Sequence, residues 1–152
     1  MLTQPNSHRL RKGRHSEIGR AYLITAVVND REPVFADWRL ARLLVAELRR
    51  AHEQQQATSL AWVVMPDHVH WLLQLQADNL SSVIGAVKSR CARAVNQHTG
   101  RQGQFWQTGF HDHGIRDGED LRPYADYLLA NPLRAGLVED IADYPLWDAY
   151  WL

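Results

Sequence analysis

The hydrophobic positions near the start of the chain predict a strand followed by a helix. Residues 21–28 are rich in residues that favour strands, and this run ends at the turn signal Asn29-Asp30. Asp37 can serve as the N-cap of the helix that follows. The apolar residues of that helix recur at helical spacing, and they are Trp38, Ala41, Leu44, Val45 and Leu48. We therefore expect these residues on the face that packs into the core.

The rest of the chain predicts three more strands and two more helices. Residues 60–65 and 68–75 are two hydrophobic runs, and Pro66-Asp67 marks the connection between them. A second helix has the apolar stripe Leu80, Val83, Ile84, Val87, Cys91, Ala94 and Val95. A fourth strand is expected within residues 105–115, and a third helix from about Asp120 to about Asn131, because Pro132 disfavours helix in the residue before it.

This order of elements matches an α+β fold of the ferredoxin-like split βαβ plan. In that plan an antiparallel sheet carries its helices on one face. Neither an internal repeat nor a low-complexity linker divides the chain. We therefore expect one domain over residues 21–138, a basic arm over residues 1–20, and an acidic and aromatic tail over residues 139–152.

The net charge of zero hides an asymmetry between the two ends of the chain. The arm contains Arg9, Arg11, Lys12, Arg14 and Arg20 against the single acid Glu17, whereas the tail contains Glu139, Asp140, Asp143 and Asp148 without any Lys or Arg. A basic arm on a small domain favours a polyanion as partner. The alternative is a solvated terminal segment without a partner.

Cysteine content and hydropathy bear on the compartment. Cys91 is the single cysteine, so the chain has no internal disulfide, which agrees with a reducing cytoplasm. No apolar run reaches the roughly 18 to 20 residues that span a bilayer, and the N-terminus shows no hydrophobic signal segment. The sequence thus predicts a cytoplasmic protein without a membrane partner.

Two histidines in the third predicted strand are the strongest chemical signal. His68 and His70 flank Val69, and side chains two residues apart on a strand project from the same face. Two adjacent imidazoles form a pair of candidate metal ligands. Tyr127 and Asn131 lie four residues apart in the third predicted helix and share one face of it. They offer a nucleophile and an amide oxygen.

Two alternatives remain open at this point. Tyr124 lies three residues before Tyr127 on the same helical face, so it is a rival nucleophile. His111 and His113 form a second His-x-His pair, which together with His68 and His70 can make the four-histidine zinc site of a hydrolase. The other interpretation is that His111 and His113 support the metal ligands from behind or contact the substrate.

Four segments carry a resemblance to a known family. Residues 127–138, with the sequence YLLANPLRAGLV, resemble the helix signature of single-tyrosine transposases of the HUH nuclease superfamily, which is named for its His-hydrophobic-His motif. Residues 62–71, residues 105–113 and the arm at 10–14 resemble one IS200-like subgroup, the REP-associated tyrosine transposases. These enzymes act on repetitive extragenic palindromes (REP) in bacterial genomes. The resemblance runs in order from about residue 9 to residue 147.

The resemblance implies an activity and a site. His68, His70 and Asn131 would bind a metal, and Tyr127 would be the nucleophile. The activity implied is a metal-dependent, site-specific single-strand DNA endonuclease and strand transferase that acts on REP-type hairpins through a covalent phosphotyrosine intermediate. Nitrogen and oxygen ligands together suit Mg²⁺ or Mn²⁺. The family also implies a monomer at the nucleoid, and the rivals are the zinc hydrolase and a non-catalytic repeat-binding protein.

Two surfaces are candidates for DNA contact. Arg9, Arg11, Lys12 and Arg14 can reach phosphates from the arm, and Lys88, Arg90 and Arg93 can line a path on the second helix. Among the six tryptophans, Trp106 is the one we single out for a base contact. The tail residues Tyr144, Trp147, Tyr150 and Trp151 either pack on the body or lie near the DNA groove.

Overall fold

A computed structural model describes residues 16–77 and 79–150 of the chain. The helices and strands in this part are β1 (Ala21–Val27), α2 (Trp38–Glu53), β2 (Ala57–Met65), β3 (His68–Leu75), α3 (Leu80–Thr99), β4 (His111–Ile115), α4 (Arg122–Leu129), α5 (Asn131–Arg134) and β5 (Trp147–Ala149). Short 3-10 helices lie at Asn29–Arg31, Val34–Ala36 and Ile141–Asp143. The predicted order of strands and helices is confirmed from β1 to α4. No helix within the described ranges combines the length and apolar character needed to cross a bilayer.

One antiparallel sheet with the strand order β4-β1-β3-β2-β5 forms the centre of the molecule. The first four strands follow the ferredoxin-like order, as the sequence predicts. In this register Thr25 of β1 lies between His70 of β3 and His111 of β4. Val27 of β1 lies opposite His68. The sheet thus places residues from three strands in one row beside the histidine pair.

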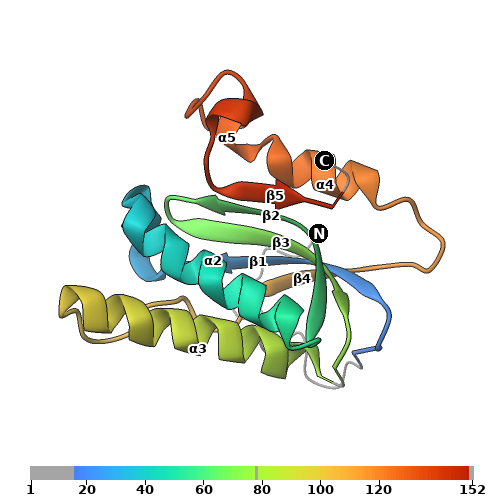
Figure 1. Ribbon diagram of the computed structural model, residues 1–152, viewed down its shortest axis with the longest axis horizontal. Helices are drawn as coiled ribbons and strands as arrows, with labels where there is room; N and C mark the ends of the chain where they lie inside the picture. The colour runs from blue at the N-terminus through green and yellow to red at the C-terminus, as the bar shows by residue number, and fades with distance from the viewer. Residues whose placement is uncertain (1–15, 78, 151–152) are drawn as a thin grey trace.

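The helices lie on both faces of the sheet, which corrects the expectation of one covered face. Figure 1 shows α2 and α3 together on one side, and α4 with α5 on the other. Val69 and Trp71 of β3 are buried, whereas His70 projects from the opposite face and contacts Tyr127 of α4. The face without α2 and α3 is therefore the one that carries the histidines.

The start of α2 shows where helical periodicity fails as a guide to burial. Asp37 caps the helix as predicted, since its side chain accepts a hydrogen bond from the backbone N–H of Arg39 at 3.0 Å. Trp38, however, is 54% exposed, so the prediction that it belongs to the core is wrong. It is the first residue of α2, and the buried stripe of that helix begins at Leu40.

Part of the predicted tail, residues Trp147–Ala149, joins the sheet as β5. β5 pairs with β2, and the backbone N–H of Val64 donates to the carbonyl of Leu146 at 2.9 Å. Tyr144 and Leu146 are buried in the core. Of the named tail residues, Tyr144 and Trp147 thus pack on the body, whereas Tyr150 is 75% exposed. Trp151 lies outside the described residues.

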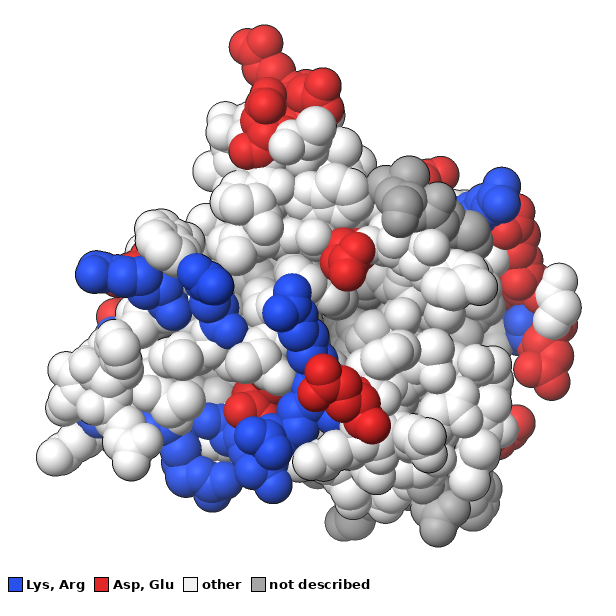
Figure 2. Space-filling view, viewed as in Figure 1, with Lys and Arg blue, Asp and Glu red and all other residues white. Residues whose placement is uncertain are grey.

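Charge is unevenly distributed over the described surface. Figure 2 shows lysines and arginines gathered over α2 and α3, and acidic residues at the far end beyond α5. The predicted basic arm residues Arg9, Arg11, Lys12 and Arg14 lie outside the described residues. The last residues of the predicted arm are attached to the sheet. The backbone N–H of Gly19 donates to the carbonyl of Leu75 at 2.7 Å, and the side chain of Arg20 donates to the carbonyl of Ile115 at 3.2 Å.

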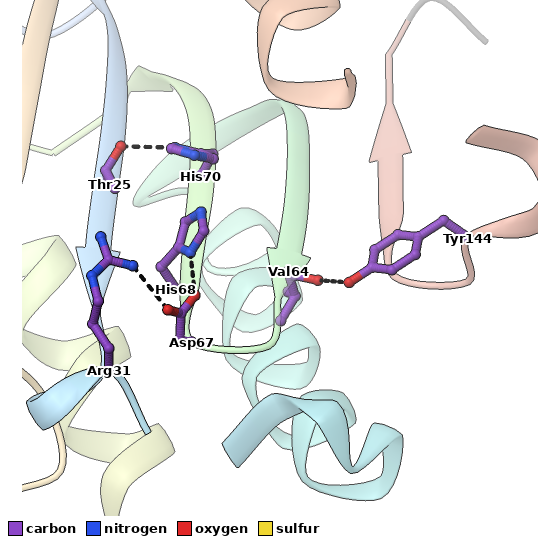
Figure 3. A network of polar contacts seen from close by, with 7 residues as sticks. All are labelled: Thr25, Arg31, Val64, Asp67, His68, His70 and Tyr144. Carbon is purple, nitrogen blue, oxygen red and sulfur yellow. Dashed lines mark hydrogen bonds and ion pairs between the residues drawn. The ribbon is translucent and has the colours of Figure 1, made fainter. Parts of the chain in front are cut away.

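Removing one hydroxyl group from the tail is expected to destabilise the fold. Tyr144 donates a buried hydrogen bond of 2.6 Å to the carbonyl of Val64 (Figure 3). Tyr144→Phe leaves that carbonyl without this donor, so we expect the free energy of unfolding to fall by about 1–2 kcal/mol, measured by urea denaturation. Tyr150→Phe is the matched control, because the Tyr150 side chain is 75% exposed. An equal loss in both variants would contradict this account of the tail.

Candidate active site

Strand β3 places the two predicted metal ligands next to each other. The ring centroids of His68 and His70 are 4.8 Å apart, and the rings meet edge to face (Figure 3). Both imidazoles line a pocket of about 870 Å³ on the histidine face of the sheet. Thr25, Arg31 and Tyr127 also line this pocket. The structure therefore brings the histidine pair and the predicted nucleophile into one cavity.

A chain of polar contacts fixes the orientation of His68. Its Nδ1 lies 2.6 Å from a carboxylate oxygen of Asp67, and the other oxygen of that carboxylate accepts a hydrogen bond of 2.8 Å from Arg31 (Figure 3). Burial alone would raise the pKa of Asp67, but the hydrogen bonds from His68 and Arg31 hold it below its usual value. An ionised carboxylate only accepts hydrogen bonds, so Nδ1 of His68 is the donor in this contact and Nε2 is left free to face the pocket.

His70 is held in a similar way by a neighbouring strand. The hydroxyl of Thr25 lies 2.8 Å from Nδ1 of His70 (Figure 3). Burial, followed by the nearby charges of His68 and Arg134, lowers the pKa of His70 to about 3. The ring is therefore neutral at neutral pH. When its Nδ1–H is donated to Thr25, its Nε2 is available to a metal.

Tyr127 lies over the histidine pair with most of its ring open to solvent. Its ring centroid is 6.5 Å from that of His70, and the side chain is 56% exposed. The guanidinium of Arg134 lies 4.6 Å from the centre of the tyrosine ring, and it also donates a hydrogen bond of 3.0 Å to the Tyr127 carbonyl. Arg134 thus fixes the turn that carries Tyr127 and adds a positive charge beside its ring.

Tyr124, the rival nucleophile, is engaged in other contacts. Its hydroxyl donates a hydrogen bond of 2.6 Å to Glu119, and this bond raises its pKa. Its ring stacks on His113 at a centroid distance of 5.7 Å. A hydroxyl that is donated to a carboxylate is harder to deprotonate, so the geometry favours Tyr127.

Asn131 is not among the residues that line the pocket. Its amide nitrogen donates a hydrogen bond of 3.1 Å to the carbonyl of Leu128. The four-residue spacing from Tyr127 assumes one continuous helix, but α4 ends at Leu129 and α5 begins at Asn131. The role of Asn131 as a third metal ligand stays a prediction.

The two His-x-His pairs are not grouped as a four-histidine site within the described residues. No three His, Cys, Asp or Glu side chains of residues 16–77 and 79–150 are grouped as a metal would need. His111 and His113 line the pocket, but Nδ1 of His111 is buried and has no hydrogen-bond partner among the described residues, and the His113 ring stacks on Tyr124. Thr25, which stands between His70 and His111, is the residue that supports His70. The described residues therefore do not bring the two histidine pairs together in one cluster, and the zinc alternative stays a prediction.

Two of the residues predicted to contact DNA have structural roles. Trp106 is only 6% exposed, because it packs against Phe35 and Phe105, and its indole N–H donates to the carbonyl of Lys88 at 2.9 Å. The ammonium of Lys88 donates to the carbonyls of Gln107 and Gly109, and burial lowers its pKa to about 8. Both side chains are thus engaged within the protein, and their contact with DNA stays a prediction.

The other two cations of the predicted path on α3 remain available. Arg90 and Arg93 are both exposed on the surface of that helix. They lie on α3, and Figure 2 shows lysines and arginines gathered over α2 and α3. Their contact with DNA stays a prediction.

Four residues that shape the site were not predicted from the sequence, namely Thr25, Arg31, Asp67 and Arg134. Asp67 directly precedes His68 and was interpreted only as part of a turn. Thr25 and Arg31 could be recognised only from the pairing of β1 with β3, which a single sequence does not reveal. Arg134 lies within the signature that resembles the transposases, which is the one signal that could have pointed to it.

The donor set fits a divalent metal ion bound through the two histidines. Both rings are oriented by hydrogen bonds at Nδ1, which is the arrangement commonly found around metal-binding histidines. The pocket is large enough to admit a phosphate and water beside them. The two imidazoles supply part of a coordination sphere that substrate oxygens and water can complete.

Comparison with known proteins identifies the family. Residues 19–120 match the family model described as IS200-like transposase. A Haemophilus influenzae protein named as a REP-associated tyrosine transposase is 31% identical over 143 residues, which cover 84% of this chain and 78% of that protein. The chain belongs to the REP-associated tyrosine transposases. The family model ends before α4, so the assignment of Tyr127 depends on the geometry above.

Two further relatives of this REP-associated tyrosine transposase bear the same family name, and a third shares its fold. The REP-associated tyrosine transposase of Escherichia coli K12 is 34% identical over 87 residues, which cover 56% of this chain and 50% of that protein. The solved structure of a REP-associated tyrosine transposase bound to a REP hairpin has a TM-score of 0.73 and 25% identity, covering 88% of this chain and 79% of that one. A Deinococcus radiodurans R1 protein described as a transposase shares the fold at a TM-score of 0.56 and 22% identity, covering 76% of this chain and 93% of that one.

Proposed function

We propose that this protein is a metal-dependent, site-specific endonuclease and strand transferase for single-stranded DNA, acting on REP-type hairpins. The observation that carries the proposal is Tyr127 placed against a histidine pair whose Nδ1 atoms are both held. Family membership supports DNA transposition, and the neighbouring structure with a bound REP hairpin supports this class of substrate. The proposal includes a monomer acting in the cytoplasm at the nucleoid.

In the proposed reaction, Tyr127 is the nucleophile. Its hydroxyl loses a proton to solvent, its oxygen bonds to the phosphorus of the scissile phosphodiester, and the bond from phosphorus to the 3′ oxygen breaks. The leaving 3′ oxygen takes up a proton, so the reaction neither consumes nor releases protons overall. The products are a 5′-phosphotyrosine link and a free 3′ hydroxyl. Because the link is still a phosphodiester, a second 3′ hydroxyl can reverse the reaction and join strands without ATP.

The residues around Tyr127 lower the cost of this attack. A tyrosine in water has a pKa near 10, so about one in a thousand is ionised at pH 7, which corresponds to roughly 4 kcal/mol. Arg134 places a positive charge beside the ring where negative charge develops. His68 and His70 would bind Mg²⁺ or Mn²⁺. When bound there, the ion supplies Lewis-acid activation of the scissile phosphate.

The test of the proposal is covalent capture. Purified protein is incubated with a single-stranded oligonucleotide that contains a REP hairpin, with Mn²⁺, with Mg²⁺ or with a chelator, and is then run on a denaturing gel. A protein–DNA adduct that forms only with the divalent ion is expected. A protein that binds the hairpin but gives neither adduct nor nicked strand would be the non-catalytic repeat-binding protein, and the proposal would fail.

The contact between Arg134 and Tyr127 predicts a measurable rate effect. Arg134→Ala is expected to slow adduct formation about 3-fold to 30-fold, because it removes the cation beside the tyrosine ring. Arg134→Lys keeps the charge and is expected to recover part of the rate. Single-turnover gel assays measure both, and Arg122→Ala at the start of α4 is the matched control. Equal rates in all four proteins would remove Arg134 from the mechanism.

A further inference from the structure

A tryptophan and two arginines on α2 form an exposed row that the proposed reaction does not use. Trp38 is 54% exposed, and the guanidinium of Arg42 lies 5.4 Å from the centre of its ring. Arg42 and Arg49 are both exposed. Positions 38, 42 and 49 recur at helical spacing, so the three side chains line one side of the helix. An exposed indole beside guanidinium groups is typical of a surface that binds a ligand or partner.

These three side chains form one wall of a groove of about 730 Å³. The opposite wall comes from Trp62 of β2 and from Pro145, Leu146 and Trp147 at the C-terminal edge of the sheet. Asp148 is the single acidic residue among the described side chains that line it, and it accepts a hydrogen bond from the N–H of Ala149 at 2.8 Å. The groove therefore combines aromatic surface with an excess of positive charge.

The groove is separate from the candidate active site. The residues that line it and those that line the pocket at the histidines do not overlap. It runs between α2 and β5, whereas the histidines face α4. Figure 2 shows that lysines and arginines gather over α2 and α3 on this face of the molecule. A strand that reaches the active site has further bases and phosphates that a second surface can hold.

We propose that this groove binds a single-stranded DNA segment that flanks the hairpin, with a base stacked on Trp38 and phosphates at Arg42 and Arg49. The inference rests on the proposed function for the identity of the DNA. Charge complementarity selects this occupant, because Arg42 and Arg49 exceed the single carboxylate of Asp148. Aromatic faces combined with cations are the usual means of binding single strands without reading their sequence. A base can replace Arg42 on one face of the indole.

Fluorescence anisotropy with two labelled probes tests the groove. One probe is a REP hairpin with a single-stranded extension, and the other is the same hairpin with blunt ends. Both are measured with Tyr127→Phe protein, so that no covalent capture contributes. Adding Trp38→Ala is expected to weaken binding of the extended probe at least about fivefold, because a stacked base is lost. Binding of the blunt hairpin is expected to stay the same.

Matched variants separate the groove from general charge and from folding. Arg42→Ala is expected to weaken binding of the extended probe and to reduce its salt dependence, whereas Arg39→Ala is not, because Arg39 pairs with Asp37 and does not line the groove. Trp38→Phe keeps an aromatic face and is expected to retain most of the affinity. It also shows whether a loss in Trp38→Ala comes from stacking or from unfolding.

Three outcomes would overturn the inference. They are unchanged binding of the extended probe in Trp38→Ala, an equal loss with the blunt hairpin, and a change of oligomeric state in Trp38→Ala that identifies a second copy as the occupant. Failure of the proposed function looks different. In that case the wild type forms no adduct, while the dependence of extended-probe binding on Trp38 remains.

Discussion

Tyr127→Phe should bind a REP hairpin with unchanged affinity and form no covalent adduct. The substitution removes only the hydroxyl, while the ring keeps its contacts with His70 and Arg134. Without the attacking oxygen no phosphotyrosine can form, so we expect adduct formation to fall by at least about 1000-fold. A denaturing gel with 5′- and 3′-labelled strands measures the adduct and the nicked product, and anisotropy measures binding.

Tyr124→Phe is the matched control for this experiment. It removes a hydroxyl of the same kind, one helical turn away, that donates to Glu119, while the Tyr124 ring stacks on His113 rather than on His70. We expect this variant to form the adduct at a rate within about threefold of wild type. Adduct formation by Tyr127→Phe, together with its loss in Tyr124→Phe, would transfer the role of nucleophile to Tyr124.

Removal of either histidine should abolish metal-dependent cleavage. His68→Ala and His70→Ala each delete one of the two oriented ligands, and we expect cleavage to fall by more than about 100-fold. Calorimetric titration with Mn²⁺ should show loss of binding in both variants. Treatment of the wild type with a chelator should have the same effect on cleavage, and adding Mn²⁺ back should restore it.

Thr25→Val provides a graded version of the same test. It leaves both imidazoles in place but removes the hydroxyl at Nδ1 of His70. We expect the affinity for Mn²⁺ to fall about 10-fold to 100-fold, because the ring is no longer oriented. If Thr25→Val were as inactive as His70→Ala, loss of orientation would explain both results. If His70→Ala kept full activity, His70 would not be a metal ligand.

Much of the fold could be predicted from the sequence because its strands and helices have strong local patterns. The range of β3 agrees with the predicted residues 68–75, and Asp37 caps α2 as expected. β5 was missed because it has only three residues and lies in an acidic segment. Its strand character depends on pairing with β2, which is a long-range contact. Trp38 was misplaced because periodicity cannot show where a helix extends past the sheet.

The candidate metal ligands could be predicted from the sequence, but the residues that orient them could not. His68 and His70 follow from the alternation of side chains along one strand, which is local geometry. The hydroxyl that orients His70 comes from β1, and no sequence pattern connects Thr25 to a residue 45 positions later. For Asn131 the local pattern itself was insufficient. The helix is interrupted between α4 and α5, so a spacing of four residues does not show that Asn131 shares a face with Tyr127.

The strand pairing at the C-terminal edge also determines whether the chain can be truncated without aggregating. β5 covers the outer side of β2, and the N–H of Tyr150 donates to the carbonyl of Leu60 at 2.7 Å. A version cut after Val138 would leave the backbone donors and acceptors of β2 open, and open strand edges pair with other chains. The described residues of the acidic tail, 139–150, do not line the histidine pocket, and we expect them to protect the molecule against aggregation by covering this edge.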